Sequence, residues 1–137
     1  TDRLGFIAGI ETLKKLKKYK IKKRISSYGN IIKSGWIEIS KKYKIDISVS
    51  GLNTILYLKF NYPNNSEITT FFTQEMLKRG YLAGSQVATS FAYNKIIIKN
   101  YLKAVDQVFE KIKVFLVKGK FPLKGKIKHS TFKRLTG

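Results

Sequence analysis

Hydrophobic residues recur every three or four positions in four segments of the chain, and this spacing predicts four helices. The segments cover approximately residues 3–20, 25–43, 66–79 and 95–117. The last segment has the most regular apolar stripe, and it follows Asn94, a residue type that caps helices well. Gly119 and Pro122 then predict its end.

Between the second and third helices the spacing of hydrophobic residues changes to two, which is typical of strands. Residues 45–50 alternate between apolar and polar side chains, and residues 54–61 alternate again after a turn expected at 51–53. These two strands are predicted to form an antiparallel hairpin. A third, short strand is expected at about 86–92.

The boundaries of the third helix carry their own signals. Ser66 is a good N-cap residue, and Glu67 in the first turn suits the positive end of the helix dipole. Gly80 stands where a left-handed residue is expected to end the helix. The resulting order is helix, helix, strand, strand, helix, strand, helix. It predicts an α+β fold of two layers, with a short antiparallel sheet of about three strands and helices packed on one face.

Composition supports one ordered domain. The chain has 137 residues, of which 43% are hydrophobic, and it contains no cysteine. No apolar run approaches the ~20 residues that cross a bilayer, so no membrane partner is expected. The chain begins at Thr1 without a signal peptide and without methionine, so we expect a piece of a longer, cytoplasmic protein.

The charge leaves two interpretations open. The formal net charge is +20, from 28 Lys and Arg against 8 Asp and Glu, and residues 14–24 are the most basic stretch. Such a charge is typical of proteins that bind nucleic acid or an anionic surface. It is also what a lysine-rich solvated face produces. Most aromatic residues fall at positions that face the predicted core, so a base-stacking surface is not indicated.

The sequence contains no recognisable catalytic constellation. His129 is the only histidine and has no carboxylate cluster near it in sequence, so a metal site is not expected. No nucleophile with a base, no phosphate-binding glycine loop and no pair of carboxylates can be identified. The residues alone therefore indicate a basic α+β domain without catalytic apparatus.

Three segments resemble class III pyridoxal-phosphate-dependent aminotransferases of the glutamate-1-semialdehyde 2,1-aminomutase type. They are residues 1–13 (TDRLGFIAGIETL), 73–83 (TQEMLKRGYLA) and 129–135 (HSTFKRL), and they occur in the order found in that family. The resemblance implies that residues 1–24 form a linking helix from a missing N-terminal large domain. It implies that residues 25–137 form the C-terminal small domain.

The same resemblance implies where the chemistry lies. In that family the large domain carries the lysine that forms the Schiff base with pyridoxal 5'-phosphate, so no residue of this chain is assigned a catalytic role and no cofactor is expected for this segment alone. Thr1 is a candidate contact to the cofactor phosphate of the partner subunit in a homodimer, and Arg3 is a second candidate for an anion contact. The substrate, an amino acid or an amino-sugar-like compound, stays open, as does aminomutase against transaminase. Nucleic-acid binding is the alternative function.

Overall fold

The computed structural model describes residues 3–128 and contains helices and strands in the predicted order. The elements are α1 (Leu4–Lys18), α2 (Ile21–Tyr43), β1 (Ile47–Leu52), β2 (Ile55–Phe60), α3 (Asn65–Leu77), β3 (Gln86–Ala88) and α4 (Lys95–Lys118). The predicted α+β class is confirmed.

The three strands form one antiparallel sheet in the order β1-β2-β3. In the central strand β2, Leu56, Leu58 and Phe60 are buried, whereas the residues between them are exposed. This is the alternation expected when one face of a sheet packs on a core and the other faces water. The register pairs inward residues with inward ones, for example Val49 with Leu58 and Val87 with Leu56.

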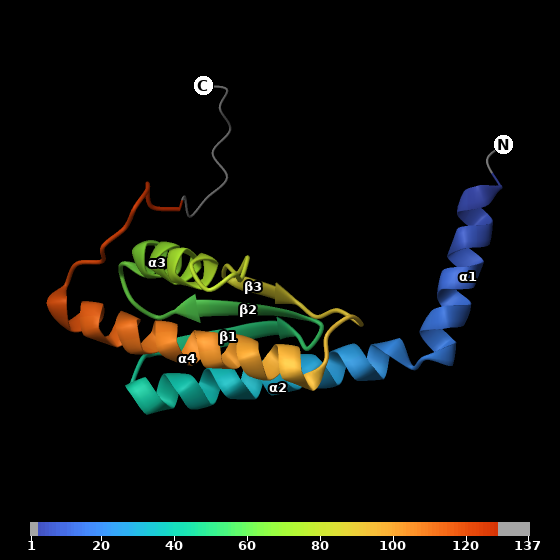
Figure 1. Cartoon of the computed structure of the whole chain (residues 1–137), viewed down its shortest axis with the longest axis horizontal. Coiled ribbons are helices and arrows are strands. Elements are labelled where there is room, and N and C mark those ends of the chain that lie inside the picture. Colours follow the sequence, from blue (N-terminus) through green and yellow to red (C-terminus); the bar gives the residue numbers. More distant parts are fainter. Residues whose placement is uncertain (1–2, 129–137) are drawn as a thin grey trace, which may run out of the picture.

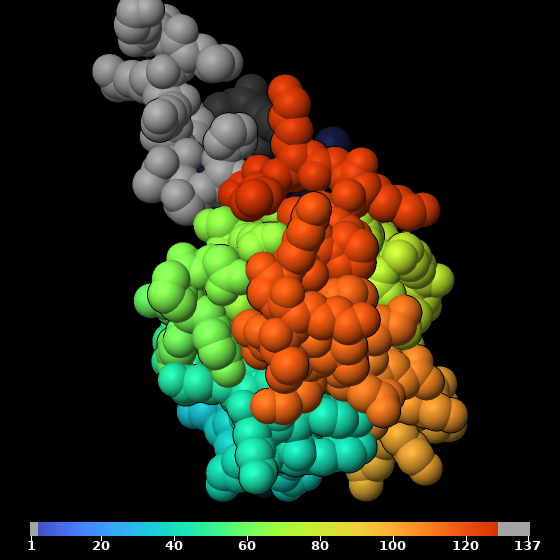
Figure 2. Space-filling view, turned by 90° about the vertical axis from the view of Figure 1, so that its left-hand side faces the viewer, coloured from blue at the N-terminus to red at the C-terminus, as the bar shows by residue number. Residues whose placement is uncertain are grey.

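Three helices cover the inner face of this sheet (Figure 1). The ring of Phe60 contacts Phe72 of α3 and Phe109 of α4, with centroids 6.1 and 5.6 Å apart. Trp36 of α2 is fully buried, as its place on the apolar stripe predicts. Figure 2 shows the end of α2, α4 and α3 in close packing on one side of the molecule. The core therefore lies between the sheet and α2, α3 and α4.

Helix α1 stands away from this body (Figure 1), and none of its residues is buried. It is separated from α2 at Tyr19 and Lys20, where Lys20 adopts a left-handed conformation with φ of 48°. That conformation breaks the helix, so the basic run 14–24 divides between the end of α1 and the start of α2. The predicted division of the chain at residue 24 stays a prediction.

Several predicted boundaries were wrong. Helix α2 begins at Ile21 rather than at residue 25, and α3 is preceded by Asn64 rather than by Ser66 as its N-cap residue. The predicted turn at 51–53 lies too early, because β1 continues through Leu52, with Gly51 at φ of 92°. Strand β3 ends at Ala88, after which the backbone nitrogen of Thr89 donates to the Thr54 carbonyl oxygen outside the ladder.

Other boundaries were predicted correctly. The side chain of Asn94 accepts a hydrogen bond from the backbone nitrogen of Ile97 and so caps α4. Gly80 and Gly119 both have positive φ angles at helix ends.

No helix in the described range is both long and apolar enough to cross a bilayer. Among residues 3–128, no group of three or more histidine, cysteine, aspartate or glutamate side chains could hold a metal ion.

Candidate functional site

Within residues 3–128, the structure does not form a site around either of the two residues proposed as anion contacts. Thr1 lies outside the described residues. Arg3 is exposed just before α1, and its carbonyl oxygen accepts a hydrogen bond from the backbone nitrogen of Ile7 at 3.2 Å. Its guanidinium forms no salt bridge within the described range, so its predicted role stays a prediction. The segment 129–135 also lies outside the described residues.

Segment 73–83 lies within the described range and contains the buried carboxylate of Glu75. Only 2% of this residue is exposed. One carboxylate oxygen accepts a hydrogen bond from Lys78, and the other accepts from Lys111 of α4 at 2.7 Å and from Arg79 at 3.3 Å. Two of the three cations come from the same segment, so Glu75 holds the end of α3 against α4.

The environment of Glu75 keeps it charged. Burial by itself would raise the pKa of the Glu75 carboxyl, but hydrogen bonds from Lys111 and Lys78, with a further one from Arg79, lower it to about 2. A buried carboxylate with this many charge-assisted hydrogen bonds remains ionised at neutral pH. It is therefore a structural anion and does not serve as a proton donor or acceptor.

The neighbours of Glu75 in the segment also have structural contacts. The side chain of Gln74 donates to the carbonyl oxygen of Pro122 at 3.1 Å and accepts from the backbone nitrogen of Lys124 at 2.7 Å. Met76 is fully buried. The segment thus ties α3 to α4 and to the chain that follows α4.

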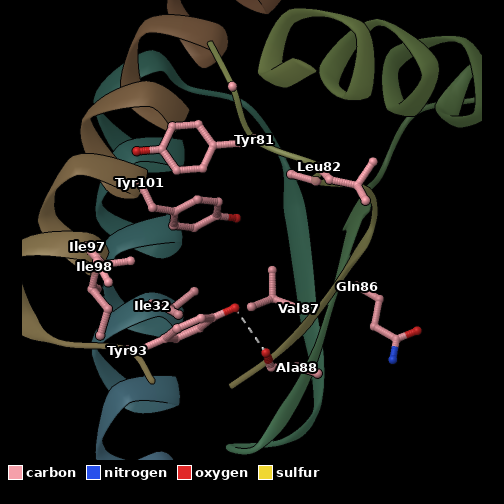
Figure 3. A pocket seen from close by; sticks show the side chains of 12 residues that line it. Ile32, Tyr81, Leu82, Gln86, Val87, Ala88, Tyr93, Ile97, Ile98 and Tyr101 are labelled. Atoms are coloured by element: carbon pink, nitrogen blue, oxygen red, sulfur yellow. Dashed lines mark hydrogen bonds between the residues drawn. The ribbon is translucent and has the colours of Figure 1, made fainter. Parts of the chain in front are cut away.

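Beyond this segment the structure contains a hollow of about 300 Å³ between α2, α4, β3 and residues 80–83. Three tyrosines line it, Tyr81, Tyr93 and Tyr101, together with aliphatic residues (Figure 3). The rings of Tyr81 and Tyr101 meet edge to face with centroids 5.7 Å apart. The Tyr93 hydroxyl donates to the Ala88 carbonyl oxygen at 3.3 Å. The hollow is of a size that small molecules or apolar side chains occupy.

Tyr101 is the most buried of the three tyrosines. Its hydroxyl oxygen accepts a hydrogen bond from the indole nitrogen of Trp36 at 3.2 Å. Burial raises the pKa of the Tyr101 hydroxyl above its ordinary value, against the opposing effect of the Trp36 hydrogen bond. The hydroxyl therefore stays protonated and does not act as a base.

This hollow does not fit pyridoxal phosphate. Neither lysine nor arginine lines it, so no cation is present for the phosphate and no amine for the aldehyde. None of the lysines in the described range is buried, whereas a lysine that forms a Schiff base is commonly tuned by burial. This hollow therefore lacks the groups that would hold the phosphate and the aldehyde of the cofactor.

Large apolar side chains are exposed on α1 and beside the hollow. On α1 the exposed set includes Phe6, at 77%, and Ile10, at 53%. At the edge of the hollow, Leu82 is 95% exposed and Ile97 is 42% exposed. Contiguous apolar patches on a protein surface commonly mark contacts to another domain or protein, so these surfaces are candidate contacts.

Sequence reasoning missed the hollow. Tyr81, Tyr93 and Tyr101 are far apart in sequence or in different elements, so no spacing marks them as neighbours. The pairing of Glu75 with Lys111 was missed for the same reason, although Glu75 and Lys111 both lie on predicted helices. The available signal was that Glu75 lies in the apolar stripe of α3, where its side chain is expected to be buried. A buried glutamate requires a nearby cation.

The fold has solved counterparts, although no protein-family model matches the chain and no curated protein matches it. FumI from Sphingopyxis sp. MTA144, in its PLP internal aldimine form, superposes with a TM-score of 0.72 and 18% identity. This match covers 80% of this chain and 27% of FumI. An omega-transaminase from Sphaerobacter thermophilus superposes with a TM-score of 0.60 and 10% identity, over 64% of this chain and 23% of its own.

The chain thus spans about a quarter of the length of each of these two solved structures. At these identities the likeness shows a shared fold. The matched 80% and 64% of this chain therefore each correspond to part of a larger chain.

Proposed function

We propose that this chain is the small C-terminal domain of a pyridoxal-phosphate-dependent enzyme that transfers an amino group, of the class III, glutamate-1-semialdehyde aminomutase type. The observation that carries the proposal is the superposition of 80% of the chain on FumI, which was solved with its cofactor. The three segments that resemble the aminotransferases, in their family order, support the same assignment.

In this proposal the cofactor and its lysine belong to a preceding large domain. Pyridoxal phosphate, when bound, supplies the electron sink for breaking bonds at the amino-bearing carbon. The chain described here has a structural role. The ion-paired Glu75 and the hydrogen-bonded Gln74 fix α3, α4 and the chain after α4 relative to one another.

The exposed apolar residues give the large domain and a second subunit their place to bind. The apolar residues of α1, among them Phe6 and Ile10, would be covered by the large domain that precedes them. The edge of the hollow around Leu82 would be covered in the assembled homodimer. Covering these side chains removes apolar surface from water, which favours the assembly.

The test uses the longer product of the same gene. We expect this product to retain pyridoxal phosphate through purification and to transfer an amino group, and the 137-residue chain alone to do neither. Glutamate 1-semialdehyde, offered without a second amino acceptor, separates an aminomutase from a transaminase. A longer product that binds no pyridoxal phosphate would contradict the proposal.

The alternative, a basic module that binds nucleic acid, is favoured by one observation. Four lysines at the junction of α1 and α2, Lys17, Lys20, Lys22 and Lys23, surround a shallow hollow of about 430 Å³. Phosphate contacts by such lysines would release counterions, so binding would fall steeply as salt rises. A gel-shift experiment at low salt with the intact chain and a mixed-sequence RNA or DNA tests this: no retention removes the alternative.

A further inference from the structure

A second hollow, of about 410 Å³, lies where β2, the first turns of α3 and the end of the described chain meet. Most of its lining residues carry a polar group, although apolar atoms form the larger part of its wall. The lining residues that carry a hydroxyl are Ser50, Tyr57, Ser66, Thr69 and Ser85, and those that carry an ammonium group are Lys59 and Lys128. Its volume falls in the range of small-molecule sites.

Most of these polar groups have no partner among residues 3–128. Thr69 donates to the side-chain oxygen of Asn65 at 3.3 Å, and the same oxygen accepts from the backbone nitrogen of Phe60 at 3.2 Å. The Asn65 oxygen is thereby occupied, so the amide of Asn65 offers the hollow only its nitrogen. The hydroxyls of Ser50 and Ser66 form no hydrogen bond within the described range.

The charges around this hollow favour an anion. Lys59 and Lys128 form no ion pair within the described range, and no carboxylate lines the hollow. The nearest acidic residue in the sequence of α3 is Glu67, and its oxygens accept hydrogen bonds from Asn64 and from the backbone nitrogen of Phe121. Two ammonium groups without a carboxylate match a ligand of charge −2.

We propose that this hollow binds a phosphate dianion, either free phosphate or the phosphate group of a small monoester. Hydroxyls, an amide nitrogen and two ammonium groups are the donors that phosphate oxygens accept from. The backbone of Lys128 is itself fixed, because its nitrogen donates to the Thr70 hydroxyl at 2.9 Å. The net charge of +20 raises the local concentration of such anions. This inference does not rest on the aminotransferase assignment.

The test follows the backbone amide resonances of the intact chain during titration with inorganic phosphate, glycerol phosphate and dimethyl phosphate. We expect saturable shifts at Ser50, Ser66 and Ser85 with the first two compounds. Dimethyl phosphate carries a single negative charge and should bind about tenfold more weakly or worse. Tighter binding of glycerol phosphate identifies a monoester as the ligand, and equal binding identifies free phosphate.

Three variants make the test specific. Lys59→Gln and Lys128→Gln should each weaken phosphate binding by about tenfold, because each removes a charge-assisted hydrogen bond. Lys41→Gln, an exposed lysine near the end of α2, should leave the affinity unchanged. The amide spectra of the variants establish that they are folded. Equal weakening by all three variants, equal binding of all three compounds, or shifts spread over the whole surface would overturn the proposal.

Discussion

Replacing Glu75 by glutamine tests the largest electrostatic effect in the structure. The substitution keeps the shape of the side chain but removes a buried negative charge that three cations contact, Lys78, Arg79 and Lys111. The pKa of the carboxyl is lowered from 4.5 to about 2 in the folded chain. At about 1.4 kcal/mol per pH unit, this difference corresponds to roughly 3 kcal/mol of stability at neutral pH.

That figure is an upper value, because Lys78 and Lys111 are about half exposed and water screens their charges. We therefore expect Glu75→Gln to lower the free energy of unfolding at neutral pH by about 2–3 kcal/mol. Urea denaturation followed by the fluorescence of Trp36, the only tryptophan, measures this difference. Glu110→Gln is the matched control, since Glu110 is exposed on α4, and its effect should stay below about 0.5 kcal/mol.

The pH dependence gives the same experiment a second readout. The folded pKa of Glu75 lies below its unfolded value, so the stabilisation is fully present above about pH 4.5 and is lost as the pH falls towards 2. The unfolding free energies of the native chain and of Glu75→Gln should therefore converge over that range. A difference that does not change with pH, or a variant as stable as the native chain at neutral pH, would contradict the stabilising role of the Glu75 carboxylate.

Two further predictions concern the backbone. Gly29→Ala should destabilise the chain by about 3 kcal/mol or more in thermal denaturation, because the new Cβ would lie 1.5 Å from the backbone oxygen of Asn53. Gly84 has open space around it, so Gly84→Ala should have little effect in the same assay. Lys44→Gly should stabilise the chain by about 1 kcal/mol, because Lys44 ends α2 with φ of 55°, where glycine is unstrained. Lys41 lies within the last turn of α2, so Lys41→Gly should instead lower the free energy of unfolding by about 1 kcal/mol in urea denaturation. Equal effects of the two lysine variants would contradict this explanation.

The sequence predicted the element order because most elements have one buried face. The alternation in β2 and the stripe of α4 are direct consequences of that burial. Gly29 allows α2 to approach the β1–β2 turn at Asn53 closely. Local chemistry was sufficient wherever a cap or a glycine acts on its neighbours in sequence, as at Asn94.

The remaining features depend on tertiary contacts that no local pattern contains. The break at Lys20 requires a lysine in a left-handed conformation, which its sequence context does not signal. The hollow beside Tyr101 and the pairing of Glu75 with Lys111 join residues from separate elements. The apolar stripe of α1 was recognised, but periodicity cannot tell whether the partner of a stripe lies in the same chain.

Sequencing the reading frame immediately upstream of the codon for Thr1 tests the aminotransferase assignment. If the chain is one domain of an amino-group-transferring enzyme, the frame continues without interruption. It then encodes a larger domain with a lysine between two strands, positioned to bind pyridoxal phosphate. A stop codon directly before Thr1, or an upstream domain of unrelated fold, would contradict the assignment.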